Sequence, residues 1–413
     1  MFKNYLLTAY KVFMRRKLFT AINLLCIVLT LVVLMVITAL LEHAFRPTGV
    51  EGKSERFLQV TMIDARSPDG HNTWNSPLGY KLIDQYLKPL KSVQVVAAVT
   101  GTETVSVYQE GRVTELAMRH ADANYWKMLD FTLRAGRLPN ADDDAQGHMV
   151  TVLNASTAGK LFAAGNAVGE KISVGGQTFE VIGVVQDELH FNAYADLWAP
   201  ITSYPTTDYQ HQMMGNFTAL LMGASAADLP LIKQEVEQVA KTVQFDDPKQ
   251  WGKAYFWADS KFDVFARLLV GESNQADSGA GTMLTLLLLM MLLFMLLPAL
   301  NLVNLNVGRI MERSSEIGVR KAFGATSAQL VAQLVLENVL LSLAGGLIGL
   351  LCAQVVLWWL QGSGLVPYLA VQLNAAVFAY GLLMALIFGL LSGVIPAWRM
   401  SRLDPVFALK GAA

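Results

Sequence analysis

Long apolar runs separate the chain into stretches typical of membrane helices and one long stretch of mixed polarity. The first run has 24 residues and would rise roughly 36 Å as a helix, enough to cross a bilayer. This length favours an uncleaved anchor over a cleaved signal peptide, whose apolar core is shorter. The apolar runs are Leu18–Leu41, Thr282–Val307, Val331–Leu360 and Leu373–Ile395. The pattern predicts an α-helical membrane protein with four transmembrane helices and a large α+β extracytoplasmic domain inserted between helices 1 and 2.

The inserted stretch, 42–281, alternates between strand-like and helix-like segments. Period-two patterns rich in Val, Ile and Thr predict strands at 57–64, 92–99, 104–110, 112–120, 148–153, 170–185 and 216–224. Helical spacing predicts helices at 78–90, 123–129, 155–162 and 226–243. Gly175 and Gly176 predict a two-residue hairpin turn. We expect two subdomains, divided near Thr102 or Arg112.

The distribution of charge agrees with this division. Charged residues make up 16% of the chain, against about 25% in a soluble domain. The stretch 42–280 nevertheless holds 20 Lys and Arg and 29 Asp and Glu, which is typical of a soluble, acidic domain. Basic residues gather instead in 1–17, 308–330 and 396–413. By the positive-inside rule these three segments lie in the cytoplasm, so that 42–281 and the short loop 361–372 lie outside.

The basic segments differ in what they are expected to do. Residues 1–17 place apolar side chains at helical spacing among five Lys and Arg, which predicts an amphipathic helix lying on anionic membrane lipids. Residues 308–330 form a cytoplasmic hairpin between the second and third spans. Residues 396–413 form a basic cytoplasmic tail.

The sequence predicts no catalytic, cofactor-binding or metal site. No GxxxxGK[ST] phosphate loop occurs, so we expect this chain not to be an enzyme that binds ATP itself. The six histidines lack metal-ligand spacing, and both cysteines, Cys26 and Cys352, lie in apolar runs. The triplet Asp142–Asp144 could hold a divalent ion, but we interpret it as a solvated loop.

Two features within the apolar runs have open interpretations. Glu337 is an ionisable residue near the start of the third span, where it serves either packing at the interface or a proton or substrate relay. Two GxxxG pairs permit close approach of helices, within one chain or across a dimer. Those glycines are Gly345, Gly349, Gly389 and Gly393.

The most specific polar segment is Met311–Leu334. Glu316 follows Arg313 by three residues and precedes Arg320 by four, a spacing that allows ion pairs along a helix. Gly324 then interrupts, and Thr326 with Gln329 predicts a capping box for the next helix. The segment therefore reads as helix, turn and helix, with apolar side chains that need a partner surface.

These residues resemble a known family. EIGVRKAFGA at 316–325, LVLENVLLSLAGGLIGL at 334–350 and the tail IPAWRMSRLDPVFALK resemble permeases of the MacB/FtsX/LolCDE superfamily of ABC transporters, the type VII or mechanotransmission group. YWKMLDFTLRAGRLP at 125–139 and AVGEKISVGGQTFEVIGVVQD at 167–187 resemble the MacB-like periplasmic core domain. The likeness extends over essentially the whole chain.

The resemblance implies a permease of the bacterial inner membrane that forms a homodimer or a paralogous heterodimer and recruits two copies of a cytoplasmic ABC ATPase, which binds ATP and Mg. The hairpin would be the ATPase-coupling element, and the segments near 42–56 and 259–281 would form a stalk. A periplasmic adaptor protein is a further conceivable partner; nucleic acid is not expected. The expected coupling residues are Glu316, Ile317, Gly318, Arg320, Lys321, Ala322, Phe323 and Gly324.

The expected function is export or extrusion of a substrate from the periplasm or outer leaflet. MacB carries its ATPase ahead of the first span, whereas here 17 residues precede that span, so we expect the ATPase to be a separate chain. The alternative is an FtsX-like scaffold that transmits force to external partners without transport. A membrane-anchored enzyme and a secondary transporter are less favoured, because the chain lacks a catalytic site and broken-helix repeats.

Overall fold

The computed structural model describes residues 17–109, 111–162, 166–312, 319, 323–324, 326–365, 371, 376, 379–387, 389–390 and 394. The chain divides into two compact units. One contains the long helices, and the other is formed chiefly by Ala44–Leu284. We call them the helical unit and the α/β unit.

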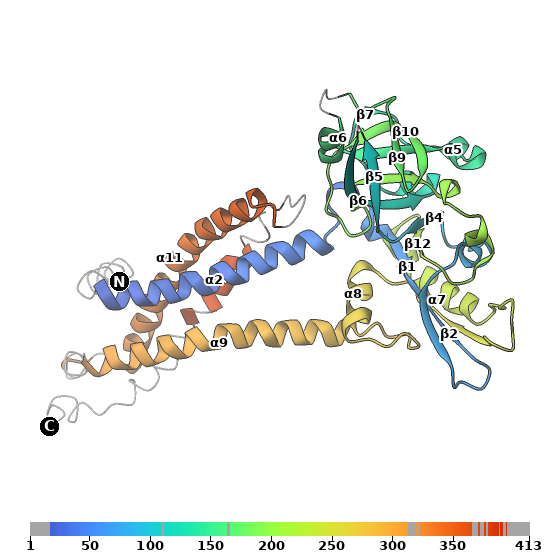
Figure 1. Cartoon of the computed structure of the whole chain (residues 1–413). Helices are drawn as coiled ribbons and strands as arrows, with labels where there is room; N and C mark the ends of the chain where they lie inside the picture. Colours follow the sequence, from blue (N-terminus) through green and yellow to red (C-terminus); the bar gives the residue numbers. More distant parts are fainter. Residues whose placement is uncertain are drawn as a thin grey trace. The chain divides into compact units, whose positions relative to one another are not determined.

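Three long helices form the described part of the helical unit (Figure 1): α2 (Lys17–Phe45), α9 (Ala280–Glu312) and α11 (Ser327–Gly362). Within the described residues, two stretches are long and apolar enough to cross a membrane, Thr20–Phe45 and Val331–Gly362. The stretch Ala280–Leu296 of α9 is a shorter apolar helix. Residues 379–387, in the fourth predicted span, are also helical.

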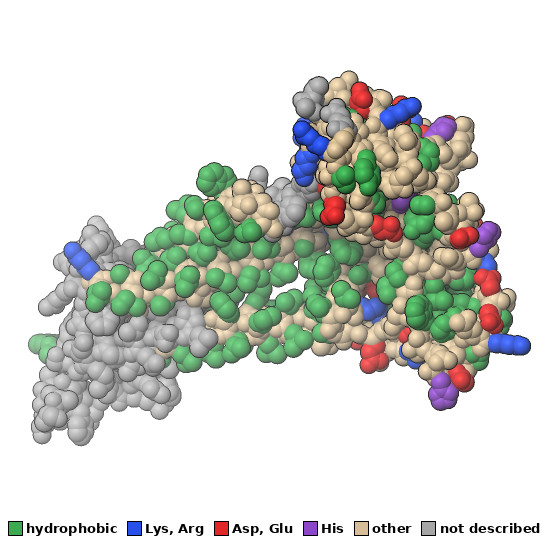
Figure 2. Space-filling model, in the orientation of Figure 1, with side chains coloured by type: hydrophobic (Ala, Val, Ile, Leu, Met, Phe, Trp, Pro, Cys, Tyr) green, Lys and Arg blue, Asp and Glu red, His purple; other side chains and the backbone are tan. Residues whose placement is uncertain are grey.

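Packing in the helical unit buries one stripe of each helix. Ile27, Leu31 and Met35 of α2 are at most 1% exposed and pack with Leu341 of α11 and with Ala385. Many other apolar side chains of these helices remain exposed, and hydrophobic residues cover the helices in Figure 2. Helices that are apolar on both their packed and their exposed faces are typical of a lipid environment.

A ten-stranded mixed sheet is the centre of the α/β unit, in the order β1-β12-β4-β6-β11-β8-β10-β9-β5, with β7 beside β10. Only the pairs β8–β10 and β6–β11 are parallel. The strands are β1 (Phe57–Val60), β4 (Val95–Thr100), β5 (Glu103–Gln109), β6 (Arg112–Ala121), β7 (Leu133–Gly136), β8 (Val150–Asn154), β9 (Lys171–Val174), β10 (Gln177–Val185), β11 (Leu197–Pro200) and β12 (Phe217–Met222). A second sheet contains β13 (Lys253–Tyr255), β2 (Met62–Arg66) and β3 (Thr73–Pro77), in that order.

Part of the large sheet closes on itself. Strand β5 pairs with β9 at one edge and with β6 at the other, so β6, β11, β8, β10, β9 and β5 form a ring. Val107, Phe179 and Val181 are at most 1% exposed and belong to the core that this ring contributes. Closure removes the free strand edges that would otherwise be open to pairing with other chains.

Short helices cover the two sheets. They are α3 (Tyr80–Leu82), which continues as a π-helical turn over Ile83–Leu87, α4 (Ala123–Met128), α5 (Ala141–Gln146), α6 (Ala155–Leu161), α7 (Leu229–Ala240) and α8 (Lys261–Leu269). The 3-10 turns are η1 (Gly49–Glu51), η2 (Ser54–Arg56), η4 (Ile201–Ser203), η5 (Asp208–His211) and η6 (Ala226–Asp228). Helix α7 shows how the pattern encodes packing, because Ile232, Val236 and Ala240 are spaced four apart and all are buried.

The structure confirms several sequence predictions and corrects two. The β9–β10 hairpin turns at Gly175 and Gly176, both at positive φ. No break occurs at Thr102 or Arg112, because β6 pairs with both β4 and β5. The solvated-loop interpretation of Asp142–Asp144 was wrong: these residues begin α5, and Asp143 is buried. Asp143 completes the capping box by accepting from the backbone of the N-cap Asn140, and it also pairs with Arg137 and His148, which indicates a structural role.

Candidate functional site

The predicted coupling hairpin lies mostly outside the described residues. Glu316, Ile317, Gly318, Arg320, Lys321 and Ala322 are among those not described. Phe323 is 88% exposed, and Gly324 has a φ of 90°, which a residue with a side chain rarely adopts. The predicted capping box is present. The side-chain oxygen of Thr326 accepts a hydrogen bond from the backbone N–H of Gln329, and the side-chain oxygen of Gln329 accepts one from the backbone N–H of Thr326. An exposed aromatic before a capped helix suits a docking surface, and the coupling role stays a prediction.

Glu337 lies within α11 and is 8% exposed. Gln333, one helical turn earlier and also buried, donates its Nε2 to Oε1 of Glu337 at 3.1 Å. A buried carboxylate with an amide neighbour on the same helix fits a packing role. The relay alternative is not needed to explain this contact.

The glycines of the third span lie against α2 of the same chain. A Cβ at Gly345 would come within 2.6 Å of Ile27, and one at Gly349 would meet Met35 and Leu31 at about 3.4–3.5 Å. Gly389 approaches α11 in the same way, with Ser342 and Val339 both at 3.0 Å. Gly393 is not among the described residues. These three glycines therefore support packing within the chain.

Within the α/β unit, the clearest constellation connects the segments that lead to α2 and α9. After α2 ends at Phe45, the turn η1 carries Glu51, which is fully buried. Lys261, at the start of α8, places its Nζ 2.5 Å from Oε2 of Glu51 and is itself 6% exposed. The backbone NH of Asn192 donates to the other oxygen of Glu51 at 2.7 Å. A buried pair of this kind requires both partners, because either charge alone would be left without solvation.

Aromatic contacts reinforce the same connection. The ring of Phe45 lies edge-on to those of Phe262 and Phe265 in α8, with centroid separations of 5.3 and 5.2 Å. Phe191 also packs on Phe265, with ring centroids 5.3 Å apart. The last residue of α2 thus contacts the helix that precedes α9, within one compact unit.

Helix α8 begins in a fully satisfied cap. Ser260 and Asp263 form a capping box, and Asp263 also accepts from Lys233 of α7 at 2.9 Å. Ser278, just before α9, donates to the remaining oxygen of Asp263 at 2.8 Å. Burial alone would raise the pKa of Asp263, but the hydrogen bonds from Lys233 and Ser278 and the charge of Lys233 lower it to about 2. Asp263 therefore remains charged and connects three elements.

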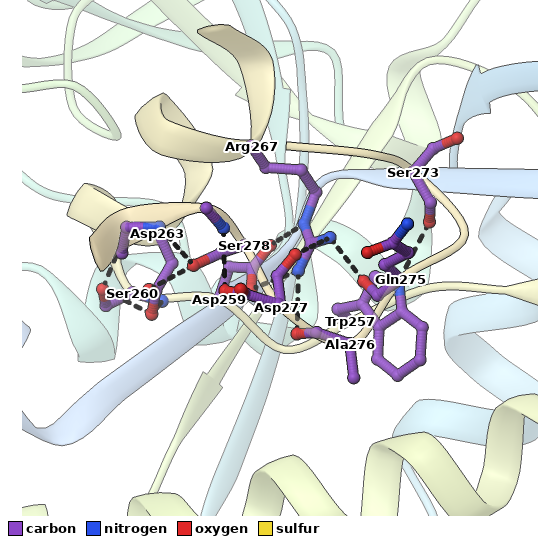
Figure 3. A network of polar contacts seen from close by, with 12 residues as sticks. Trp257, Asp259, Ser260, Asp263, Arg267, Ser273, Gln275, Ala276, Asp277 and Ser278 are labelled. Atoms are coloured by element: carbon purple, nitrogen blue, oxygen red, sulfur yellow. Dashed lines mark hydrogen bonds and ion pairs between the residues drawn. The ribbon is translucent and has the colours of Figure 1, made fainter. Parts of the chain in front are cut away.

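Arg267 organises the loop between α8 and α9. Its guanidinium donates to both carboxylate oxygens of Asp259, at 2.7 and 3.2 Å. The remaining N–H groups donate to backbone carbonyls of the loop 271–279 (Figure 3), at distances between 2.7 and 3.4 Å. Those carbonyls belong to Glu272, Gln275, Ala276 and Asp277. One side chain thus holds the segment that enters α9.

The loop is also attached to both sheets. Asp259 exchanges backbone hydrogen bonds with Gln59 of β1, at 2.8 and 2.9 Å. Ser273 donates to Asp64 of the small sheet at 2.7 Å, and the indole of Trp257 donates to the Ser273 carbonyl at 2.9 Å. The guanidinium of Arg267 lies 5.8 Å from the centre of the Trp257 ring. Movement of the loop would therefore be passed to the sheets.

We call this set the junction: Glu51, Asp259, Lys261, Asp263, Arg267 and the loop 271–279. The sequence suggested a stalk in these segments but not their partners. A signal existed in the Ser260-x-x-Asp263 capping pattern, which predicts the start of α8. No group of three or more His, Cys, Asp or Glu that could hold a metal occurs in the part of the chain that the structure describes. The junction is suited to carrying mechanical load.

Comparisons with known proteins agree with this architecture. The model of the MacB-like periplasmic core domain matches residues 20–239, and that of the FtsX-like permease C-terminal matches residues 288–405. The uncharacterized ABC transporter permease YknZ of Bacillus subtilis is 24% identical over 332 residues, which is 78% of this chain and 77% of YknZ.

Two longer relatives align over part of their length. The pyoverdine export ATP-binding/permease protein PvdT of Pseudomonas fluorescens is 23% identical over 97% of this chain. The macrolide export ATP-binding/permease protein MacB of Salmonella typhi is 24% identical over 69% of it. The chain spans 58% and 42% of these two proteins. The crystal structure of the extracellular domain of YknZ aligns with a TM-score of 0.36 and 18% identity, over 44% of this chain and 91% of that one.

The first family model covers more than half of the chain, and the second covers the C-terminal helices. The first model includes most of α2 and most of the α/β unit, and the second begins within α9. The chain therefore belongs to the family of ABC transporter permeases that have a MacB-like periplasmic core domain and an FtsX-like C-terminal domain.

Proposed function

We propose that the chain is the permease subunit of an ABC transporter in which a separate cytoplasmic ATPase changes the conformation of the periplasmic α/β unit. The output is export or extrusion of a substrate from the periplasm or the outer leaflet. The junction is the observation that carries this proposal. The segments leading to α2 and α9 are bonded to each other through Glu51 and Lys261, and the loop before α9 is bonded to the sheets through Arg267 and Asp259.

Such bonding supports transmission of force through the junction. A helix that enters a domain through a loosely attached loop would move without moving the domain. Here the loop 271–279 is held by Arg267, by Trp257 through Ser273, and by Asp263 through Ser278. A displacement of α9 along or across its axis would therefore displace β1 and the small sheet as well.

The proposal includes the topology and the partners that the sequence suggested. Four spans place both termini in the cytoplasm of the inner membrane, with two ATPases on a permease dimer. The hairpin 308–330 then contacts the ATPase through Glu316, Arg320 and Lys321 around an apolar group that includes the exposed Phe323. PvdT and MacB are named as ATP-binding/permease proteins, which supports an ATPase as partner.

Purification of the full chain with its stable partners tests the proposal. An affinity-tagged chain expressed in its own host should bring down an ABC ATPase, identified by mass. Glu316→Lys reverses a charge in the hairpin and should lower the recovered ATPase by about tenfold, because a charge pair at an interface is replaced by repulsion. Insertion into the membrane should be unchanged.

The matched control is Glu312→Lys, the same charge reversal four residues earlier in the sequence. It should leave ATPase recovery within about twofold of wild type. Absence of any ATPase from the wild-type complex would contradict the proposal as a whole. Equal recovery with Glu316→Lys would contradict only the assignment of the hairpin.

A further inference from the structure

A cavity of about 760 Å³ lies within the α/β unit, between the large sheet, the small sheet and the α8–α9 connection. Its volume falls within the range of small-molecule sites in proteins. The walls include the ends of β1, β2, β3, β4 and β12, the end of α8 and the first part of the loop 271–279. The cavity therefore shares a wall with the junction.

Two amide side chains that line this cavity lack hydrogen-bond partners. Gln59 is 1% exposed, and neither its amide oxygen nor its amide nitrogen is hydrogen-bonded within the described structure. Asn192 is 3% exposed, and its Nδ2 also has no hydrogen-bond partner within the described structure. Buried polar atoms nearly always find a partner, so two such groups beside one cavity need a physical reason. Because these atoms have almost no accessible surface, they do not face the open cavity, and a guest would reach them only after the side chains turn.

Arg119 of β6 provides a cation in the same wall. Among the described residues no carboxylate lies within ion-pair distance of it, and its Nε has no hydrogen-bond partner. Its terminal nitrogens reach only two backbone carbonyls, those of Asn192 and Phe191, at 3.4 and 3.3 Å. Burial lowers the pKa of the Arg119 guanidinium, although Tyr125 and Glu51 act in the opposite direction. Glu51 itself is occupied by Lys261 and by the NH of Asn192.

The other cation of the cavity, Arg267, behaves differently. It has a bidentate carboxylate partner in Asp259 and donates to four carbonyls of the loop 271–279. Glu272, the acidic residue in the wall, is exposed and accepts from Gln275. Arg119 is therefore the cation whose charge is least compensated, and a planar guanidinium of this kind favours a carboxylate or phosphate.

Apolar side chains complete the wall. Met62 and Phe191 are each 41% exposed, and Leu268 is 80% exposed. Exposed apolar groups next to an uncompensated cation favour a guest with an apolar body and an anionic head.

We propose that this cavity is a binding site for a small amphipathic molecule with an oxyanion head, a carboxylate or a phosphate, held by Arg119. Met62, Phe191 and Leu268 cover the apolar body. Binding requires no nucleotide and no ATPase, so the site can be tested independently of the proposed transport function. A guest in this position would contact the loop 271–274 directly.

Fluorine NMR on the full chain in lipid nanodiscs, without ATPase, tests the site. The probes are 4-(trifluoromethyl)benzoate, the corresponding benzylphosphonate, and the neutral 4-(trifluoromethyl)benzamide, with empty nanodiscs as blank. At least one of the two anions should bind saturably, and the amide about tenfold or more weakly, because it lacks the charge that Arg119 requires. Whichever anion binds more tightly identifies the head group.

Three variants complete the test. Arg119→Met should weaken binding of the anion by about tenfold or more. Thr102→Trp, at an exposed position of the wall, should block the cavity without changing a buried residue. Arg112→Gln, an exposed arginine of the same strand outside the cavity, should bind as wild type does. Equal binding of the anions and the amide, or full binding to either Arg119→Met or Thr102→Trp, would overturn the proposal.

Discussion

The two segments that join the α/β unit to its flanking helices are built differently. The segment after α2 is short and has one fully buried charge, Glu51, whose partner lies on the other segment. The segment before α9 is held by Arg267 through a carboxylate and four backbone carbonyls, and by Asp263 through Ser278. The first connection combines one buried ion pair with the aromatic packing of Phe45 on α8, whereas the second is held by a distributed polar network. Force applied through α9 is therefore spread over many polar bonds, whereas the α2 side has one buried ion pair and the packing of one aromatic ring.

The buried pair should give the largest effect when it is broken. Lys261→Met leaves Glu51 buried and without its cation, which should cost about 3–5 kcal/mol in the free energy of unfolding. Denaturant unfolding of the full chain in nanodiscs, followed by the α/β unit's tryptophan fluorescence, would measure the loss.

Two controls frame this result. Lys53→Met removes a partly exposed lysine of the same α2 segment, whose partner Asp130 is half-exposed. This change should lower the free energy of unfolding by less than about 1 kcal/mol. The double variant Glu51→Gln with Lys261→Met should recover much of the loss, since no buried charge remains. Equal destabilisation by Lys53→Met and Lys261→Met would show that the α2 segment does not depend on the buried pair.

Close packing of the α9 segment should give an intermediate effect. A Cβ at Gly271 would lie 2.6 Å from the Ser278 carbonyl oxygen and 2.7 Å from the Cα of Arg267. Gly271→Ala should therefore destabilise the loop by about 1–3 kcal/mol and speed hydrogen exchange across 271–279.

Gly281→Ala is the matched control, because nothing lies within 4 Å of a Cβ at that helical position. It should be neutral or stabilise α9 by up to about 1 kcal/mol, as alanine favours helix. If both substitutions changed the free energy of unfolding in the same direction, the loop would not be closely packed.

The pH response of Asp263 should be the smallest effect. Its folded pKa of about 2 is below the ordinary aspartate pKa of 3.8, so its contribution to stability is complete above about pH 4 and is lost as the pH falls through about 2. Asp263→Asn should cost about 1 kcal/mol at pH 7, because Lys233 is half-exposed and screening weakens the pair.

The difference in melting temperature between wild type and Asp263→Asn should therefore shrink between pH 7 and pH 3. A constant difference over that range would show that the effect of Asp263 is its hydrogen bonding as a cap and not its charge.

The sequence predicted the elements with strong local patterns. The β9–β10 hairpin followed from two adjacent glycines, and the start of α11 from the capping pair Thr326 and Gln329. The strands β3, β7, β11 and β13 were not predicted, since segments of three to five residues contain too few alternations to show a period.

The junction could not be predicted because its contacts are not local. Glu51 and Lys261 are 210 residues apart, and nothing in the spacing of charges identifies that pair. The ring of strands likewise depends on β5 pairing with β9 across more than sixty intervening positions of the sequence. Hydrophobic periodicity tells which face of a strand is buried, but not which strand lies beside it.

Double electron–electron resonance on the full chain with the proposed ATPase tests the central claim, that the junction transmits nucleotide state to the α/β unit. Spin labels at Glu170→Cys and Leu347→Cys, in a background with Cys26 and Cys352 replaced by alanine, report the separation of the two units. With the junction intact, the distance distribution should shift between the nucleotide-free and the ATP-bound ATPase. Arg267→Met should keep ATPase recruitment and lose most of that shift. An identical shift with and without Arg267, or no shift in the wild type, would contradict the claim.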